Sequence, residues 1–382
     1  PSGLSIFYIS TIISQVTYSS GLSSFVSGVG SEMIEVTPFF HTMALAIKEG
    51  LPGKDDEIIT TTLFCYVISS LVTGITFYSL GKLKLGKIVG FFPRHILIGC
   101  IVGVGYFLLA TGLEVTTRAA KVEYTWSFFA NLFTNVDTLM KWGLPALLTV
   151  VLIFTQRCFS NSLVLPSFYI ATLVAFHFIV ALIPNVSLDK LRQIGWIFPV
   201  AASSDKWYDH YKLFDFSKVH WFLVLKQFPT MMALTFFGIL HVPINIPALA
   251  ISLQKDKVDV DKELIAHGYS NFISGLFGSI QNYLVYTNSV LFIRAGADSA
   301  MAGYILALLT FAIMVIGPVL ISYIPICIVG SLIFLLGYEL IYEALVETLG
   351  KVTPFEYLTI LIIVLTMGIF DFVLGVIVGI LI

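Results

Sequence analysis

Two carboxylates follow a polar, glycine-rich stretch early in the chain, and they are the side chains best suited to binding a charged solute. Glu32 and Glu35 come directly after residues 21–31, which end in Gly30 and Ser31. Residues three positions apart share one face of a helix, so we expect Glu32 on the first turn of a short helix and Glu35 one turn later. A carboxylate in that position attracts a cation or carries a proton. The alternatives are that either one caps the helix or pairs with a basic residue elsewhere.

A second polar, glycine-rich stretch, residues 275–289, holds uncharged donors and acceptors. Its centre reads Gln281, Asn282 and Tyr283. Amide and hydroxyl groups of this kind can bind the head group of an α-amino acid. The alternative is that they cap the helix that follows.

A histidine and an asparagine lie in the charge-free stretch 227–254. The side chain of His241 titrates near neutral pH and is a candidate for carrying a coupled proton, whereas a core histidine that only packs explains the residue equally well. Pro243 and Pro247 are expected to break the helix near Asn245. The freed backbone carbonyls would then line the site.

The elements that must hold these residues are membrane-spanning helices. Of the 382 residues, 57% are apolar or aromatic and 12% are charged, and the mean hydropathy is +0.93. These values exclude a soluble globular protein. A spanning helix needs about 20 predominantly apolar residues, and charge-poor stretches predict roughly 13 segments, two of them half-helices. The stretches are residues 1–31, 36–47, 58–81, 95–113, 142–156, 158–188, 227–254, 264–293, 299–338 and 357–382.

Charge and cysteine usage exclude several classes of function. The net charge is −2 and the basic residues are scattered over short loops, so we expect no nucleic-acid partner. The four cysteines lack the spacing and histidine partners of a metal site, and we expect no cofactor. Neither a nucleophile with its base nor a phosphate-binding loop indicates an enzyme. The chain begins at Pro1 without a basic leader, so we expect a piece of a longer polypeptide.

The two glycine-rich stretches fall at corresponding places in the two halves of the chain. Irregular backbone at membrane depth is tolerated only where protein or a water-filled cavity surrounds it. Paired interruptions of this kind are typical of transporters that are built from inverted repeats and bind their solute near the midplane. The alternative is that the glycines serve close helix packing.

Several blocks of sequence resemble the sulfate permease (SulP) family of secondary transporters. Residues 90–112 begin G-F-F-P-R-H-I-L-I-G and resemble the family's fifth helix. Residues 263–271, E-L-I-A-H-G-Y-S-N, with the later Gly275, Asn288-Ser289 and Ala295-Gly296, resemble its most recognisable block. Residues 368–379 are similar to its last helix.

The resemblance implies an all-α polytopic membrane fold of two inverted seven-segment repeats, divided into a core and a gate domain. Solute would bind between half-helices three and ten. The whole chain, 1–382, would be the transport domain, here about 13 of 14 segments, without the first helix and the cytoplasmic STAS domain. Its approximate parts are a first repeat 1–188, an external connection 189–218 and a second repeat 219–382. The family also implies a possible homodimer.

The departures from the family pattern concern the sign of the charge on the solute. Asn288, next to Thr287, stands where the family motif has an arginine, and Glu32 adds a negative charge near the other half-helix. The first glycine-rich stretch most resembles a fungal vacuolar branch linked to storage of basic amino acids. We therefore expect a multi-pass vacuolar membrane protein that moves arginine or lysine into the vacuole, coupled to protons through Glu32 or His241. The alternatives are a transporter of sulfate or another inorganic anion and a scaffold or sensor without transport.

Overall fold

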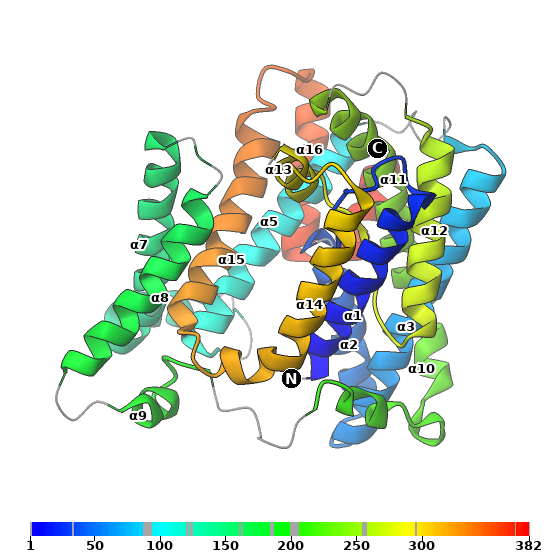
Figure 1. Cartoon of the computed structure of the whole chain (residues 1–382). Helices are drawn as coiled ribbons and strands as arrows, with labels where there is room; N and C mark the ends of the chain where they lie inside the picture. The colour runs from blue at the N-terminus through cyan, green and yellow to red at the C-terminus, as the bar shows by residue number, and fades with distance from the viewer. Residues whose placement is uncertain are drawn as a thin grey trace. The chain divides into compact units, whose positions relative to one another are not determined.

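The structure, a computed structural model, is almost entirely helical (Figure 1). It describes residues 2–32, 34–86, 94–119, 122, 125–159, 161, 163–183, 187–198, 206–253, 258–294, 296–370 and 372–381. The roughly thirteen expected segments correspond to α1 (Ser2–Thr17), α2 (Thr37–Gly50), α3 (Asp55–Lys82), α5 (Arg94–Thr117), α7 (Val136–Cys158), α8 (Val164–Leu182), α11 (Phe228–Ser252), α12 (Val260–Leu276), α13 (Tyr286–Arg294), α14 (Ala300–Ile321), α15 (Ile326–Ile341), α16 (Pro354–Ile369) and α17 (Phe372–Leu381). The two crossings expected in residues 299–338 are α14 and α15.

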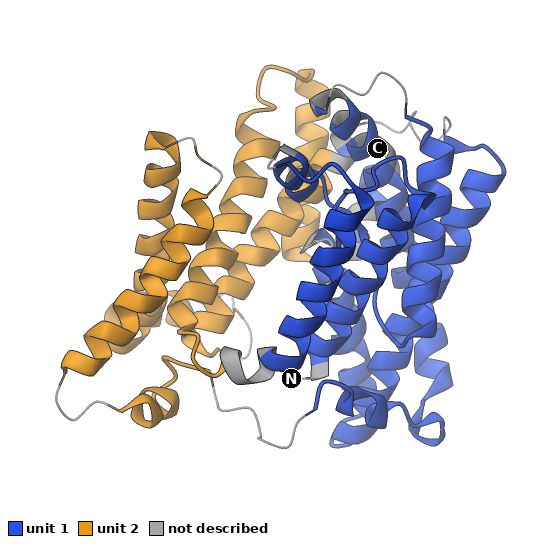
Figure 2. Ribbon diagram, viewed as in Figure 1, with its two compact units in different colours: residues 1–97, 204–316, 371–381 blue, residues 98–203, 317–370, 382 orange. Residues whose placement is uncertain are grey.

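The chain divides into two compact units, and each unit draws on both halves of the sequence (Figure 2). Unit 1 comprises residues 1–97, 204–316 and 371–381. In chain order its elements are α1 (Ser2–Thr17), η1 (Tyr18–Leu22), β1 (Gly30–Ser31), η2 (Ile34–Val36), α2 (Thr37–Gly50), α3 (Asp55–Lys82), η3 (Asp209–Leu213), η4 (Phe216–Lys218), α10 (Trp221–Lys226), α11 (Phe228–Ser252), α12 (Val260–Leu276), β2 (Tyr283–Leu284), α13 (Tyr286–Arg294), most of α14 (Ala300–Ile321) and α17 (Phe372–Leu381).

Unit 2 comprises residues 98–203, 317–370 and 382. Its elements are most of α5 (Arg94–Thr117), α6 (Trp126–Thr134), α7 (Val136–Cys158), α8 (Val164–Leu182), α9 (Leu188–Gln193), α15 (Ile326–Ile341), η5 (Tyr342–Val346) and α16 (Pro354–Ile369). Helix α7 of the first half is joined to α15 of the second, because Thr149 Oγ1 donates to the Ser331 carbonyl at 3.0 Å.

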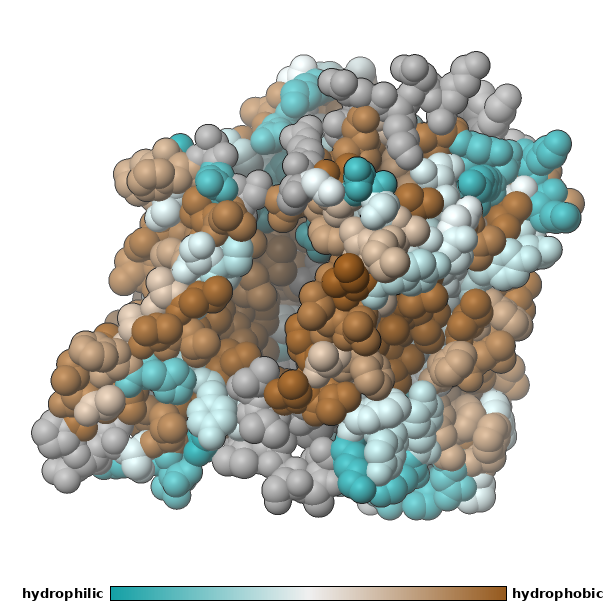
Figure 3. Space-filling view, in the orientation of Figure 1, coloured by the Kyte–Doolittle hydropathy of each residue, from teal (hydrophilic) through white to brown (hydrophobic). Residues whose placement is uncertain are grey.

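Six helices in the described part of the chain are long and apolar enough to cross a membrane. Helix α3 shows how the sequence defines one of them: Asp55, Asp56 and Glu57 form its first turn, and Lys82 lies in its last. These charges suit the positive N-terminus and the negative C-terminus of the helix dipole. Hydrophilic residues gather on the surface where α3 ends and α12 begins, whereas the surface over α14 is mainly hydrophobic (Figure 3). That distribution fits helices surrounded by lipid.

Helices α3 and α12 lie against each other in unit 1, and glycines let their backbones meet. A Cβ atom on Gly74 would lie 2.5 Å from the Phe272 nitrogen, and one on Gly268 would lie 2.6 Å from the Tyr78 nitrogen. Small residues at such contacts allow close packing of helices in a membrane. Close packing therefore accounts for these two glycines, which lie outside the two glycine-rich stretches.

The expected break in the helix that carries Asn245 is wrong. Helix α11 runs continuously from Phe228 to Ser252, through Pro243 and Pro247. A proline removes one backbone hydrogen bond, but a membrane helix can retain its course where neighbouring helices and local adjustments satisfy the freed carbonyl. Asn245 therefore lies on a helix, and no unwound backbone at this point contributes carbonyls to a site.

Candidate solute-binding site

The two glycine-rich stretches meet in unit 1 as a two-stranded antiparallel sheet. Strand β1 pairs with strand β2, with Gly30 opposite Leu284 and Ser31 opposite Tyr283. A short helix follows each strand, η2 and α2 after β1 and α13 after β2. The irregular backbone predicted from the sequence is thus held by pairing the two halves of the chain with each other.

Hydrogen bonds beyond the strands tie the start of α13 to the first stretch. The Val29 N–H donates to Ser289 Oγ at 2.9 Å, and the Val285 N–H donates to the Val29 carbonyl at 2.9 Å. Ser289 Oγ in turn donates to the Val285 carbonyl. These bonds therefore connect the residue before strand β1 to the start of helix α13.

Glu32 directly follows strand β1 and precedes η2, so the expectation that it lies on the first turn of a helix is wrong. The strand extends to Ser31 because β2 supplies its pairing partner, and the helical turn starts only at Ile34. Thr11 Oγ1 and Ser31 Oγ donate to Glu32 Oε2 at 3.3 and 3.4 Å. Glu32 Oε1 is buried without a hydrogen-bond partner, and no cationic side chain contacts this carboxylate in the described part of the chain.

Glu35 lies in η2 and within electrostatic range of the Tyr283 hydroxyl. Tyr283 is fully buried, and its hydroxyl oxygen lacks a hydrogen-bond partner among the described residues. That hydroxyl packs against helix α11, because a Cβ atom on Gly238 would lie 2.6 Å from it. Tyr283, from the second stretch, therefore lies beside α11 and within electrostatic range of Glu35.

Gln281 and Asn282 are both fully buried, but they differ in whether a side-chain atom remains available to hydrogen-bond a solute. Asn282 Oδ1 accepts from Ser270 Oγ at 2.5 Å, and its Nδ2 donates to Ser10 and Ser274. Gln281 Nε2 donates to Ser69 Oγ at 2.5 Å, and its Oε1 has no hydrogen-bond partner among the residues that the structure describes. Asn282 is thus occupied in holding helices together, whereas Gln281 keeps an acceptor.

The remaining predicted residues are spread over three elements of unit 1. Gly30 is buried and Ser31 half-buried in strand β1. Asn288 lies exposed on α13, and the side chain of Thr287 lies outside the described residues. On α11, His241 Nδ1 is buried with no hydrogen-bond partner in the described part of the chain, and its ring lies 5.9 Å from that of Phe237.

Helix α12 supplies two buried polar residues that the sequence reasoning did not single out. Glu263 is fully buried, and its carboxylate accepts from Ser23 Oγ at 2.8 Å and from the Ser24 N–H at 2.6 Å. His267 is also buried and contacts strand β2. Both belong to the block E-L-I-A-H, where an acid and a histidine four residues apart on an otherwise apolar helix were a usable signal.

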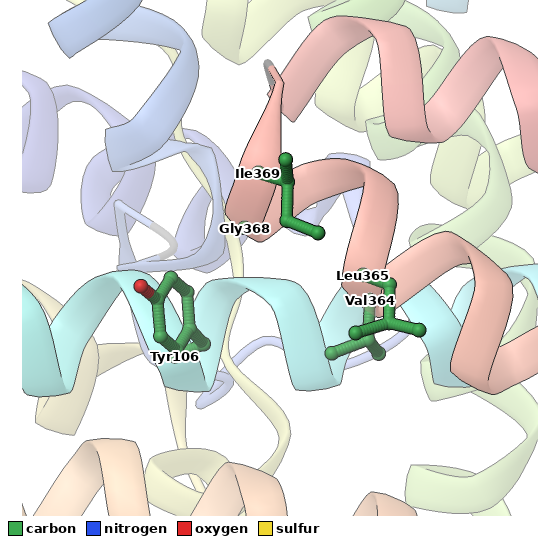
Figure 4. Close-up of a pocket in the computed structure, with 5 residues that line it drawn as sticks. All are labelled: Tyr106, Val364, Leu365, Gly368 and Ile369. Atoms are coloured by element: carbon green, nitrogen blue, oxygen red, sulfur yellow. The ribbon is translucent and has the colours of Figure 1, made fainter. Parts of the chain in front are cut away.

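Unit 2 contains an apolar cavity of about 490 Å³. Its wall consists of Tyr106 on α5 and of Val364, Leu365, Gly368 and Ile369 on α16 (Figure 4). A charged solute needs polar partners in a desolvated pocket, and this one offers only the Tyr106 hydroxyl. All the predicted solute contacts lie in unit 1, so this cavity is not the predicted site. Metal-binding groups of three or more histidine, cysteine or acidic residues are likewise absent from the described residues.

Comparison with known proteins relates this arrangement to membrane transporters. The model of the sulfate permease family matches residues 2–363. The vacuolar basic amino acid transporter VSB1 of Saccharomyces cerevisiae is 77% identical over 382 residues, which are 100% of this chain and 37% of that protein. The bicarbonate transporter BicA of Picosynechococcus sp. is 25% identical over 358 residues, 91% of this chain and 57% of that protein. The chain thus spans less than two thirds of the length of these curated relatives.

Solved structures share the fold. The transmembrane domain of a cyanobacterial bicarbonate transporter BicA matches with a TM-score of 0.70 at 16% identity, covering 99% of this chain and 90% of that one. The overall structure of SLC26A9 matches with a TM-score of 0.67 at 15% identity, covering 99% of this chain and 63% of that one. The all-α polytopic fold predicted from the sequence is confirmed.

Proposed function

Because the chain belongs to the sulfate permease family, we propose that it forms the membrane pathway of a secondary transporter that moves arginine or lysine into the vacuole in exchange for protons. The 77% identity to the yeast vacuolar basic amino acid transporter over the whole chain supports the substrate class and the vacuolar membrane. Only part of such a relative is represented here, so the proposal concerns the transport domain within the full protein.

The observation that carries the proposal is the carboxylate of Glu32. Its Oε1 atom is buried without a partner among the described residues, next to a strand that joins the two halves of the chain. An unpaired carboxylate at membrane depth is costly and requires either a proton or a cation. Two unit charges about 4 Å apart interact by roughly 4 kcal/mol at an effective dielectric constant of about 20. A cationic side chain would gain this energy, and an anion would be repelled by a similar amount.

Proton exchange follows from the same carboxylate. When the solute is bound, its positive charge keeps Glu32 ionised; when the solute leaves, a proton is the smallest cation that can replace it. The two states would then alternate, with one proton moving against one cationic solute. Gln281 Oε1 and the Tyr283 hydroxyl, both buried and unpartnered, are the polar atoms we assign to the amino-acid head group.

The test uses the full-length protein in proteoliposomes with an imposed pH gradient and compares uptake of labelled arginine, lysine and sulfate. We expect gradient-dependent uptake of the two amino acids, lost at least tenfold in Glu32→Gln. The matched control is Glu49→Gln, because Glu49 lies exposed at the end of α2. Uptake of sulfate in place of arginine would overturn the proposal, and uptake of none of the three would favour a scaffold.

A further inference from the structure

Among the described residues, strands β1 and β2 form an isolated pair, and each has an outer edge without a neighbouring strand. At membrane depth no water is available to satisfy the backbone N–H and C=O groups of such an edge, and each unsatisfied group costs several kcal/mol. Side chains of the helix that precedes each strand meet this need. Helix α1 precedes β1, and helix α12 precedes β2.

The outer edge of β1 is closed by one carboxamide. Gln15 Oε1 accepts from the Gly30 N–H at 3.1 Å, and Gln15 Nε2 donates to the Gly28 carbonyl at 3.0 Å. One side chain thus makes both bonds that a neighbouring strand would supply. Helix α1 lies directly on the strand, because a Cβ atom on Gly30 would be 2.5 Å from Ser14 Oγ.

The outer edge of β2 is closed in the same way from α12. Asn271 Oδ1 accepts from the Asn282 N–H at 2.9 Å, and Asn271 Nδ2 donates to the Asn282 carbonyl at 2.9 Å. His267 Nε2 accepts from the Leu284 N–H at 3.1 Å. Since that nitrogen accepts, its ring proton must lie on Nδ1, which donates to the Glu263 carbonyl at 2.7 Å. Each strand is therefore completed by the helix before it in the chain.

We propose that Gln15 is a positioning residue for the transported solute: its carboxamide substitutes for a third strand and sets the position of Glu32, two residues beyond Gly30. The side-chain contacts of Glu32 are to small hydroxyl residues, among them Thr11 and Ser31 through bonds of 3.3 and 3.4 Å. The course of the backbone through Gly28 and Gly30 decides where its carboxylate lies. The transport part of this inference rests on the proposed function, whereas the structural part does not.

Hydrogen–deuterium exchange of the full-length protein tests the structural part without any solute. Gln15→Met keeps the length of the side chain and removes its hydrogen bonds to Gly28 and Gly30, together with the one to Ser19 Oγ. We therefore expect exchange of a peptide covering residues 28–32 to become roughly tenfold faster. Gln227→Met is the matched control, because Gln227 is a buried glutamine elsewhere in unit 1. Unchanged exchange at residues 28–32 in Gln15→Met would refute the inference. Gln15→Glu retains the acceptor for Gly30 and should give an intermediate rate, which also serves if Gln15→Met fails to fold.

Measurements of arginine uptake then show whether Gln15 positions Glu32 for the solute or only supports the fold. A misplaced Glu32 should raise KM about fivefold or more in Gln15→Met, with the maximal rate and the thermal midpoint near those of the wild type. A variant that exchanges faster but keeps the wild-type KM would limit Gln15 to a structural role. Should the wild type fail to transport arginine, the proposed substrate is wrong, and the exchange experiment still decides whether Gln15 closes the strand.

Discussion

In the proposed function, the charges of single residues in unit 1 decide which solutes can bind. Glu32 is an acid without a cationic neighbour among the described residues, and Asn288 supplies no positive charge on the short helix α13. Both positions were identified from the sequence, because each departs from the pattern that the chain otherwise resembles. The free oxygen of Glu32 could not be predicted, since it depends on how Thr11 and Ser31 share the other oxygen.

Restoring a positive charge on α13 should weaken the binding of a cation. We expect Asn288→Arg to raise the KM for arginine at least tenfold, because a guanidinium in this region competes for Glu32 and repels the solute. Asn288 is exposed, so the larger side chain should leave the thermal midpoint nearly unchanged. Asn288→Gln, which changes size without charge, is the control for uptake kinetics in proteoliposomes. Equal KM values for the wild type and Asn288→Arg would mean that residue 288 lies away from the solute path.

The short elements differ most from what the sequence predicts. The long apolar stretches predicted the spanning helices, because a run of about 20 apolar residues has few other stable conformations in a bilayer. The sheet of β1 and β2 has two residues in each strand, and its pairing depends on contacts between halves of the chain that no local pattern records. The same reason explains why Glu32 follows a strand.

Packing between the long helices α3 and α12 leads to a prediction about glycine. A Cβ atom on Gly268 would meet the backbone nitrogen of Tyr78 at 2.6 Å, and backbone cannot move aside as a side chain can. Gly268→Ala should therefore push the helices apart and destabilise the protein by about 1–3 kcal/mol. Gly143→Ala on α7 is the control, because its nearest neighbour would be Leu139 at 4.0 Å. Thermal denaturation in detergent compares the two, and equal midpoints would contradict the close approach.

At the scale of the whole chain, each unit is completed by segments from both halves. In unit 1, Ser70 Oγ on α3 donates to the Asn271 carbonyl on α12 at 2.9 Å. In unit 2, Thr149 on α7 and Ser331 on α15 make the corresponding connection. The family resemblance implied such a division, whereas hydropathy alone gives only a series of helices. A half of the chain by itself would leave buried polar groups such as Glu263 without their partners.

Expressing the full-length protein as two fragments, divided in the connection between its halves, tests whether each half depends on the other for stability. We expect a fragment that ends after Phe198 and a fragment that begins at Lys206 to be degraded when either is expressed alone, because each lacks the partners for its polar helix faces. Expressed together, they should assemble and regain at least a tenth of the arginine uptake of the intact protein, since that division cuts none of the described helices. A division within α3, between Thr73 and Gly74, is the control and should abolish assembly. A single half that is stable and monodisperse would show that its helices satisfy their polar groups without the other half.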